Sequence, residues 1–222
     1  MICHSVAHSC DSPESYNEVI IRHTSNASLH YLVRYWSFKT YRRPIFGCAA
    51  AICIPLLIQQ NVDGSDFFNR SWEEFKVGFN DSRGNYWLGN ELLHRQTYNG
   101  RYKLRFDLQA RNLSWYYAQY GAFVVYSEAV GYKLVVSVYS GNAGDAFSSH
   151  NNMMFTTYDR DNDPWNNPSY KNNCAVYNGG GFWYKTCSHV RVNVVRGRGD
   201  DFLWCSAIGN IDLLSSRMWL VC

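Results

Sequence analysis

Hydrophobic residues recur at two different spacings between residues 70 and 140, and the change of spacing predicts helices followed by strands. Three aromatic residues of NRSWEEFKVGF fall at i, i+3 and i+7, the spacing of one helical face: Trp72, Phe75 and Phe79. Ser71 and Glu74 stand three residues apart at the start of this segment, which is the arrangement of a capping box. A second short helix is expected after Asn90, in NELLHR.

Farther along the chain the hydrophobic period becomes two. Four apolar residues of YKLRFDL point to one face of a predicted strand: Tyr102, Leu104, Phe106 and Leu108. Charged residues alternate with them, as expected for a half-buried antiparallel strand. The segments GAFVVYSE and YKLVVSVYSG predict two more strands, with turns near Gly121 and Gly131. Helices followed by a meander of strands favour the α+β class over a parallel α/β sheet.

The two ends of the chain carry weaker signals. The longest uncharged run, residues 45–58, is too short to span a bilayer, so we expect a buried strand or core segment there, with a signal-like apolar segment as the alternative. The first ten residues, MICHSVAHSC, lack the basic start and the apolar run of a secretory signal peptide. After Ser140 the chain becomes rich in Gly, Asn and Asp, and such loops on a rigid sheet often carry binding sites.

Composition narrows the class of protein. The 222 residues have a net charge of only +3 with scattered basic residues, so nothing favours nucleic-acid binding. Aromatic residues make up 17% of the chain, enough to fill a large core or to line a ligand groove. Eight cysteines without a C-x-x-C pair indicate an oxidising compartment rather than a zinc ribbon. Four N-x-S triplets are compatible with secretion: those that begin at Asn26, Asn69, Asn80 and Asn112.

The segment YDRDNDPW gathers three carboxylates within five residues, at Asp159, Asp161 and Asp163. Such a segment is either a solvated acidic turn or a cation site. An EF-hand loop that began at Asp159 would need glycine at its sixth position and glutamate at its twelfth, where this chain has Pro164 and Tyr170. An EF-hand is therefore excluded, while a solvated acidic turn and a cation site of another kind both stay open.

Five segments in one order are similar to the fibrinogen-like domain of fibrinogen chains, ficolins, tachylectins, angiopoietins and tenascins. They are LIQQNVDGSDFFNRSWEEFKVGF, GNYWLGNELLHR, YKLRFDL, YSGNAGDAFSSHNNMMFTTYDRDND and NCAVYNGGGFWYKTC. The resemblance covers residues 56–193 and implies a central antiparallel sheet, short helices and a loop-rich part that holds calcium and ligand. Residues 1–55 lack the expected disulfide-bonded subdomain and stay unassigned. Residues 194–222 do not resemble the family's usual end, which returns a strand to the central sheet.

The resemblance assigns the acidic loop to calcium. The implied ligands are the side chains of Asp161 and Asp163 and the backbone carbonyls of Trp165 and Asn167. Calcium is a hard cation that takes about six to eight oxygen ligands, so carboxylates and carbonyls suit it. Asp159 is expected to lie outside the ligand set and to pair with Arg160 or cap the loop.

The resemblance also implies a disulfide between Cys174 and Cys187, with a cis peptide bond between Thr186 and Cys187. Six residues are expected to form a small pocket for acetyl groups: Tyr177, Trp183, Tyr184, Thr186, Cys187 and His189. The alternative is that the aromatic residues belong to the core and that His189 is an ordinary exposed histidine. Pairing of the other cysteines stays open: Cys3, Cys10, Cys48, Cys53, Cys205 and Cys222.

The resulting expectation is a secreted, calcium-stabilised, non-enzymatic module that binds acetylated carbohydrate or glycoprotein as a lectin does. The alternatives are a module that binds a protein receptor, as in angiopoietins or tenascins, or a non-functional, aberrant product with foreign ends. Catalysis is not expected, because acids committed to a cation are poor general acids and a disulfide-bonded cysteine is no nucleophile. An oligomer is compatible with this function, although no collagen-like or heptad segment is seen.

Overall fold

The computed structural model describes residues 55–187, 189–197, 199 and 201–222. Four of the cysteines, Cys3, Cys10, Cys48 and Cys53, lie outside the described residues, and so do the Asn26 triplet and most of the uncharged run 45–58. The end of that run is described, and it enters a strand in which Ile58 is fully buried. This part of the run is therefore a core strand, as expected.

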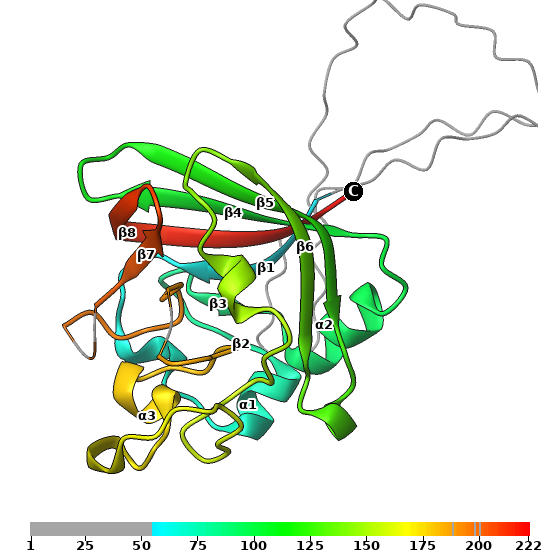
Figure 1. Cartoon of the computed structure of the whole chain (residues 1–222), viewed down its shortest axis with the longest axis vertical. Helices are drawn as coiled ribbons and strands as arrows, with labels where there is room; N and C mark the ends of the chain where they lie inside the picture. Colours follow the sequence, from blue (N-terminus) through cyan, green and yellow to red (C-terminus); the bar gives the residue numbers. More distant parts are fainter. Residues whose placement is uncertain (1–54, 188, 198, 200) are drawn as a thin grey trace, which may run out of the picture. The chain divides into compact units, whose positions relative to one another are not determined.

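An eight-stranded antiparallel sheet forms the centre of the described part (Figure 1). Its strands are β1 (Leu56–Asn61), β2 (Phe79–Asn80), β3 (Tyr86–Trp87), β4 (Lys103–Ala110), β5 (Trp115–Val125), β6 (Leu134–Gly141), β7 (Leu203–Ser206) and β8 (Gly209–Val221). They run in the order β2-β3-β1-β8-β4-β5-β6, and β7 pairs only with β8. The helices are α1 (Trp72–Val77), α2 (Asn90–Thr97) and α3 (Cys174–Asn178), with 3-10 turns η1 (Asp66–Phe68), η2 (Glu128–Val130), η3 (Phe147–His150) and η4 (Pro168–Tyr170). This architecture confirms the α+β class.

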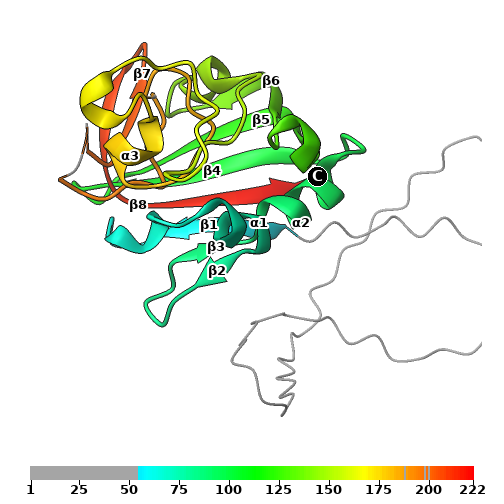
Figure 2. The same cartoon turned by 90° about the horizontal axis from the view of Figure 1, so that it is seen from below.

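The helices and the loop-rich segment lie on one side of the sheet, as Figures 1 and 2 show from two directions. Large aromatic side chains fill the space between these layers. The indole of Trp183, for example, packs against Trp87, Phe123 and Phe155, with ring centroids 5.1 to 6.2 Å apart. The high aromatic content therefore serves the core. Within the described residues no helix is both long enough and apolar enough to cross a membrane.

The helix predictions hold with one exception. Ser71 Oγ accepts the N–H of Glu74, and the Glu74 carboxylate accepts the N–H of Ser71 at 2.8 Å, so the capping box is formed. The helix at Asn90 is also confirmed. Phe79 is not on the α1 face, because Gly78 ends the helix at a φ of 93° and Phe79 begins β2.

The meander β4-β5-β6 is confirmed, with Leu104 and Phe106 fully buried on the predicted face. The turn expected at Gly121 is wrong. Gly121 lies within β5 and faces Val138 of β6, because the strand continues through it to Val125. Gly131 does lie in the connection between β5 and β6, in the left-handed conformation that favours glycine.

The expectation that residues 194–222 return no strand to the sheet is also wrong. They supply β8, which pairs with β1 on one side and β4 on the other. Buried Met218 and Leu220 alternate with the half-buried Arg217 and Trp219, as a strand with one face on the core requires. The alternative of a non-functional product rested on foreign sequence at both ends, and the C-terminal end no longer supports it because it completes the sheet.

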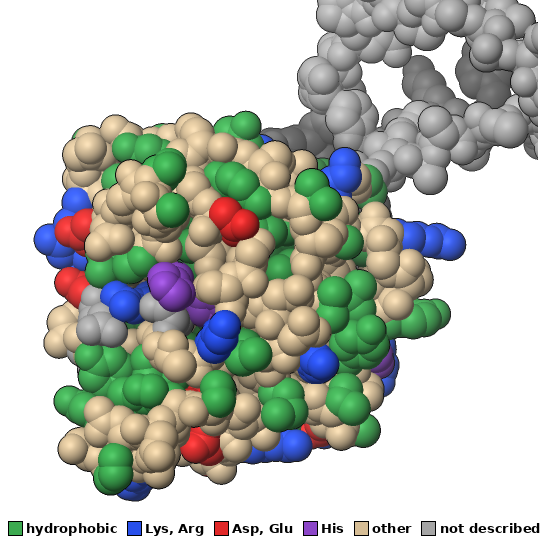
Figure 3. Space-filling model, viewed as in Figure 1, with side chains coloured by type: hydrophobic (Ala, Val, Ile, Leu, Met, Phe, Trp, Pro, Cys, Tyr) green, Lys and Arg blue, Asp and Glu red, His purple; other side chains and the backbone are tan. Residues whose placement is uncertain are grey.

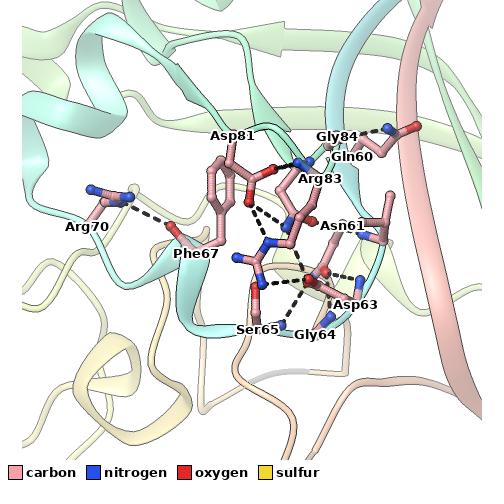
Figure 4. Close-up of polar contacts among 12 residues, drawn as sticks. Gln60, Asn61, Asp63, Gly64, Ser65, Phe67, Arg70, Asp81, Arg83 and Gly84 are labelled. Atoms are coloured by element: carbon pink, nitrogen blue, oxygen red, sulfur yellow. Dashed lines mark hydrogen bonds and ion pairs between the residues drawn. The ribbon is translucent and has the colours of Figure 1, made fainter.

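A polar network fixes the loop after β1 against the turn between β2 and β3 (Figure 4). The Arg83 guanidinium lies 3.0 Å from the carboxylate of Asp63 and 3.1 Å from that of Asp81. Asn85 Nδ2 donates to the same two carboxylates at 3.2 and 3.0 Å. Gln60 Nε2 donates to the carbonyl of Gly84 at 2.7 Å, so this network holds the short hairpin in register beside β1.

Candidate functional site

The acidic loop begins with a carboxylate that serves the fold. Asp159 Oδ1 accepts the N–H of Trp72 at 2.9 Å and the hydroxyl of Thr157 at 2.7 Å. Trp72 is the first residue of α1, whose leading N–H groups have no partner within the helix. Asp159 therefore caps α1 rather than its own loop, and its place outside the cation set stays a prediction.

Arg160 binds the same helix from the next position. Its guanidinium lies 3.9 Å from the ring centre of Trp72 and 3.8 Å from the carboxylate of Glu128. Glu128 also accepts the indole N–H of Trp72 at 2.7 Å and pairs with Lys76 at 2.9 Å. These contacts anchor the base of the loop to the helical layer, so the following residues start from a fixed point.

Asp161 and Asp163 lie beside one another at the turn that follows. The N–H of Asp163 donates to Asp161 Oδ1 at 3.2 Å. Asp163 Oδ1 accepts the N–H of Trp165 and Oδ2 accepts the N–H of Cys174, each at 3.0 Å. The pKa of Asp163 is raised to about 6, with burial as the largest cause; the two N–H donors act to lower it, and the neighbouring Asp161 acts to raise it. A cation at these two carboxylates would offset both the burial of Asp163 and the repulsion between the two negative charges, so the pair fits calcium.

The two carbonyls of the predicted set behave differently. The Asn167 carbonyl accepts the N–H of Tyr170 at 3.0 Å and that of Asn172 at 2.9 Å. A carbonyl oxygen has two lone pairs, and both are engaged here because the chain turns into η4. Asn167 therefore does not fit the ligand set in this conformation, and the Trp165 carbonyl stays a prediction. Among the described residues no three His, Cys, Asp or Glu side chains gather around one point, and the predicted set does not require that.

The disulfide between Cys174 and Cys187 is confirmed, with Cα atoms 4.9 Å apart. Because the N–H of Cys174 donates to Asp163, this disulfide is joined directly to the acidic loop. The expected cis bond between Thr186 and Cys187 is wrong, since no peptide bond of the described chain is cis. A trans bond is the ordinary state, because a cis bond before a residue other than proline costs about 3 kcal/mol.

Two of the predicted pocket aromatics are core residues. Trp183 is 0% exposed and its indole N–H donates to the carbonyl of Tyr132 at 2.7 Å. Tyr184 is 1% exposed and its hydroxyl donates to the carbonyl of Gly180 at 2.6 Å. Their surfaces and polar atoms are all used inside the protein, as the alternative reading held. Neither side chain lines an open pocket.

Three further residues of the predicted pocket differ in their burial. Thr186 is exposed and Cys187 is buried. His189 is exposed, with Nδ1 3.2 Å from the hydroxyl of Ser149. The buried histidine of this region is His150, which the sequence analysis missed. Its only signal was its place in SSHNNM, within a recognised segment.

A partly exposed aromatic cluster lies next to the acidic loop, and the sequence analysis did not recognise it as a cluster. Tyr177 lies 5.3 Å from Trp165 and 4.7 Å from Tyr170, measured between ring centroids, and the Trp165 and Tyr170 rings stack at 6.0 Å. Tyr170 is 40% exposed. Residues 164–173 provide two of these rings, so the aromatic content of that stretch was the available signal.

Charge does not mark any large binding surface on the described residues of the face shown in Figure 3. Basic and acidic side chains lie scattered there among apolar and uncharged ones. A ligand of this face would therefore be held by shape and local hydrogen bonds more than by a long-range field.

Comparison with known proteins gives a consistent result. The family model of the fibrinogen beta and gamma chains, C-terminal globular domain, matches residues 52–208. The chain is 44% identical over 153 residues to the fibrinogen alpha chain of Homo sapiens, a match that covers 62% of this chain and 17% of that protein. It is 43% identical over 131 residues to angiopoietin-related protein 2 of Mus musculus, covering 59% of this chain and 26% of the relative. The chain thus spans about a quarter or less of these two relatives.

Solved structures share the fold. The fibrinogen-like globe domain of human ANGPTL2 superimposes with a TM-score of 0.66 and 37% identity, covering 75% of this chain and 79% of that one. A lamprey fibrin D-dimer, solved with the peptide ligand Gly-His-Arg-Pro-amide, gives a TM-score of 0.63 and 30% identity over 74% of this chain and 60% of that one. The match to the family model extends past residue 193, to the β7 strand.

Proposed function

The chain belongs to the family of the C-terminal globular domain of fibrinogen beta and gamma chains, and on that premise we propose that it is a non-catalytic recognition domain of an extracellular protein. The Cys174–Cys187 disulfide supports an oxidising compartment. The carboxylates of the acidic loop support the absence of catalysis. Asp159 and Asp163 are committed to backbone N–H groups, and Cys187 has no free thiol.

The ligand that the geometry favours is a protein or a peptide, bound by the loop-rich surface of residues 158–187. The observation that carries this choice is the burial of Trp183 and Tyr184, two of the three aromatic residues expected to line the acetyl pocket. The lamprey relative with a bound tetrapeptide supports the same ligand class. A receptor of the angiopoietin kind falls within this proposal.

Acetylated carbohydrate is the second candidate ligand, and the partly exposed aromatic cluster supports it. Sugar rings have apolar faces that pack on aromatic rings, and the cluster of Trp165, Tyr170 and Tyr177 offers such a surface next to hydrogen-bonding loop groups. A ligand so small would bind weakly, near a millimolar dissociation constant or about −4 kcal/mol. Avidity from several domains would then be required.

Calcium is proposed as the structural cofactor, held by the side chains of Asp161 and Asp163 and the carbonyl of Trp165. When bound, it would neutralise the two adjacent carboxylates and so hold the acidic loop against the disulfide. Titration calorimetry and a thermal shift should detect one site, because an ion that binds only the folded loop stabilises by mass action. Asp161→Ala with Asp163→Ala should abolish both signals, and Asp66→Ala, an exposed carboxylate of η1, is the matched control. A wild-type protein with no heat and no shift at millimolar calcium would reject the cofactor.

Two immobilised probes separate the candidate ligands. The first is Gly-His-Arg-Pro-amide together with a peptide array, and the second is an N-acetylated resin eluted with N-acetylglucosamine, both with calcium present. Peptide binding without retention on the resin supports the first proposal. Retention on the resin supports the second proposal if Tyr170→Ala weakens it and Tyr126→Ala does not. Tyr126 is the control because it is 48% exposed but lies at the end of β5. Failure of both probes would contradict a recognition role for this loop surface.

A further inference from the structure

We propose that Asn112 carries an N-linked glycan whose first sugars lie in the groove between the β4–β5 turn and the β7–β8 turn. The inference rests on the extracellular location proposed above. Figure 1 shows both turns at the left end of the sheet. The Arg111 N–H donates to the Asp212 carbonyl at 3.0 Å, which joins the β4–β5 turn to the first residues of β8.

The turn presents Asn112 as an accessible acceptor. Asn112 Oδ1 accepts the N–H of Ser114 at 3.0 Å, which forms an Asx turn across the N-x-S triplet. The turn is closed by two backbone hydrogen bonds between Ala110 and its neighbours: the Ala110 N–H donates to Ser114 and the Leu113 N–H donates to Ala110, each at 2.9 Å. Within the described part of the chain nothing accepts a hydrogen bond from Asn112 Nδ2, and Asn112 is exposed.

Three N-x-S triplets lie in the described part, and only this one has all three residues exposed. In the triplet at Asn69 the serine is Ser71, whose hydroxyl is engaged with Glu74 in the capping box. In the triplet at Asn80 the middle residue is Asp81, which is held in the network of Figure 4. The proposal therefore concerns Asn112.

The surroundings of Asn112 suit a sugar. A groove of about 250 Å³ adjoins it, with the half-buried Tyr116 and Ile211 as apolar lining and the ion pair of Arg111 with Asp212 as polar lining. Pyranose rings have apolar faces and hydroxyl edges, which match such a mixed surface. Leu113, the next residue of the same turn, is 64% exposed. A glycan on Asn112 would shield this apolar side chain, which would otherwise favour association.

The attachment is a simple group transfer. Asn112 Nδ2 forms a bond to the anomeric carbon of an N-acetylhexosamine in a lipid-linked oligosaccharide diphosphate. The bond between that carbon and the diphosphate oxygen breaks, the lipid diphosphate leaves with the electron pair, and Nδ2 loses one proton. No oxidant or reductant is required.

The test uses the full chain with an appended cleavable secretory signal, expressed in animal cells. Peptide mapping after treatment with peptide N-glycosidase should show Asn112 converted to Asp in most of the secreted protein. Asn112→Gln and Ser114→Ala should abolish this conversion, whereas Ser114→Thr should retain it because threonine also completes an acceptor triplet. An Asn112 peptide that is unmodified in the secreted chain overturns the proposal.

The position of the sugars is tested by hydroxyl-radical footprinting before and after enzymatic deglycosylation. Labelling of Ile211, which lines the groove, and of Leu113 should rise at least twofold when the glycan is removed. Val77, which is 67% exposed at the end of α1, is the matched control and should not change. Equal labelling of Ile211 in both samples would overturn the groove assignment. Neither result depends on ligand binding, so a failure here is distinct from a failure of the recognition proposal.

Discussion

His150 gives the sharpest prediction for stability, because it is a fully buried histidine with both ring nitrogens in use. Nδ1 lies 2.7 Å from the carbonyl of Trp183, and Nε2 accepts the N–H of Val190 at 3.2 Å. Together these partners require the neutral ring with its proton on Nδ1. Protonation of Nε2 would direct its N–H at the N–H of Val190, so that hydrogen bond would be lost, and it would place a positive charge in the core.

The magnitude follows from the pKa. Burial is the largest cause, and it lowers the pKa of His150 from 6.5 to about 4 against the carbonyl of Trp183, which acts to raise it. Three basic side chains near the ring also act to lower the pKa and contribute to this net value: His189, Lys185 and Arg191. The unfolded chain therefore binds this proton more tightly, and stability is present above pH 6.5 and lost as the pH falls towards 4. The full loss is about 3 kcal/mol, of which about 2 kcal/mol should be gone by pH 5.

Urea denaturation at 25 °C between pH 7.5 and 4.5 measures this loss as a fall in the free energy of unfolding. His150→Gln should be less stable at neutral pH but should lack this part of the pH dependence. His94→Gln, which changes a half-buried histidine of α2, is the matched control and should keep the wild-type slope. Equal pH dependence in the wild type and His150→Gln would refute the reasoning. A native-state NMR titration with a midpoint near 6.5 for His150 would refute it as well.

Three further predictions concern the fold around the acidic loop. Gly180→Ala should lower the free energy of unfolding by about 2 kcal/mol or more, because the added Cβ would overlap a backbone carbonyl oxygen. Gly121→Ala is the control: the nearest atom lies 3.5 Å from its added Cβ, so its stability should change by less than about 1 kcal/mol. Equal melting temperatures for the two variants would contradict this prediction. Replacing Cys174 and Cys187 together by serine should lower the free energy of unfolding by about 3 kcal/mol, because the disulfide closes a loop of 13 residues. Chemical denaturation measures this loss, and a loss below about 1 kcal/mol would contradict the prediction. Asp159→Ala should cost about 1 kcal/mol through loss of the α1 cap, measured by thermal unfolding, and Asp159→Asn should recover part of it if capping is the cause.

Local chemistry was enough to predict several elements from sequence. The capping box of Ser71 and Glu74 uses atoms three residues apart, so its geometry is set within one helical turn. The strand of Leu104 and Phe106 follows from alternation alone, because a half-buried strand must alternate. The family, and with it the disulfide of Cys174 and Cys187, followed from the order of five segments.

What the sequence left open depends on contacts between residues far apart in the chain. Asp159 caps a helix 87 residues away, and His150 receives its N–H from Val190, 40 residues away. The central place of β8 depends on its pairing with β1 and β4, which no local pattern specifies. The sequence by itself thus determined the class, the family and the local elements, because these depend on neighbouring residues. Only the tertiary structure decided which aromatic residues are core, which carbonyl of the acidic loop is already engaged and which N-x-S triplet is fully exposed, because burial and hydrogen-bond satisfaction are properties of the packed chain.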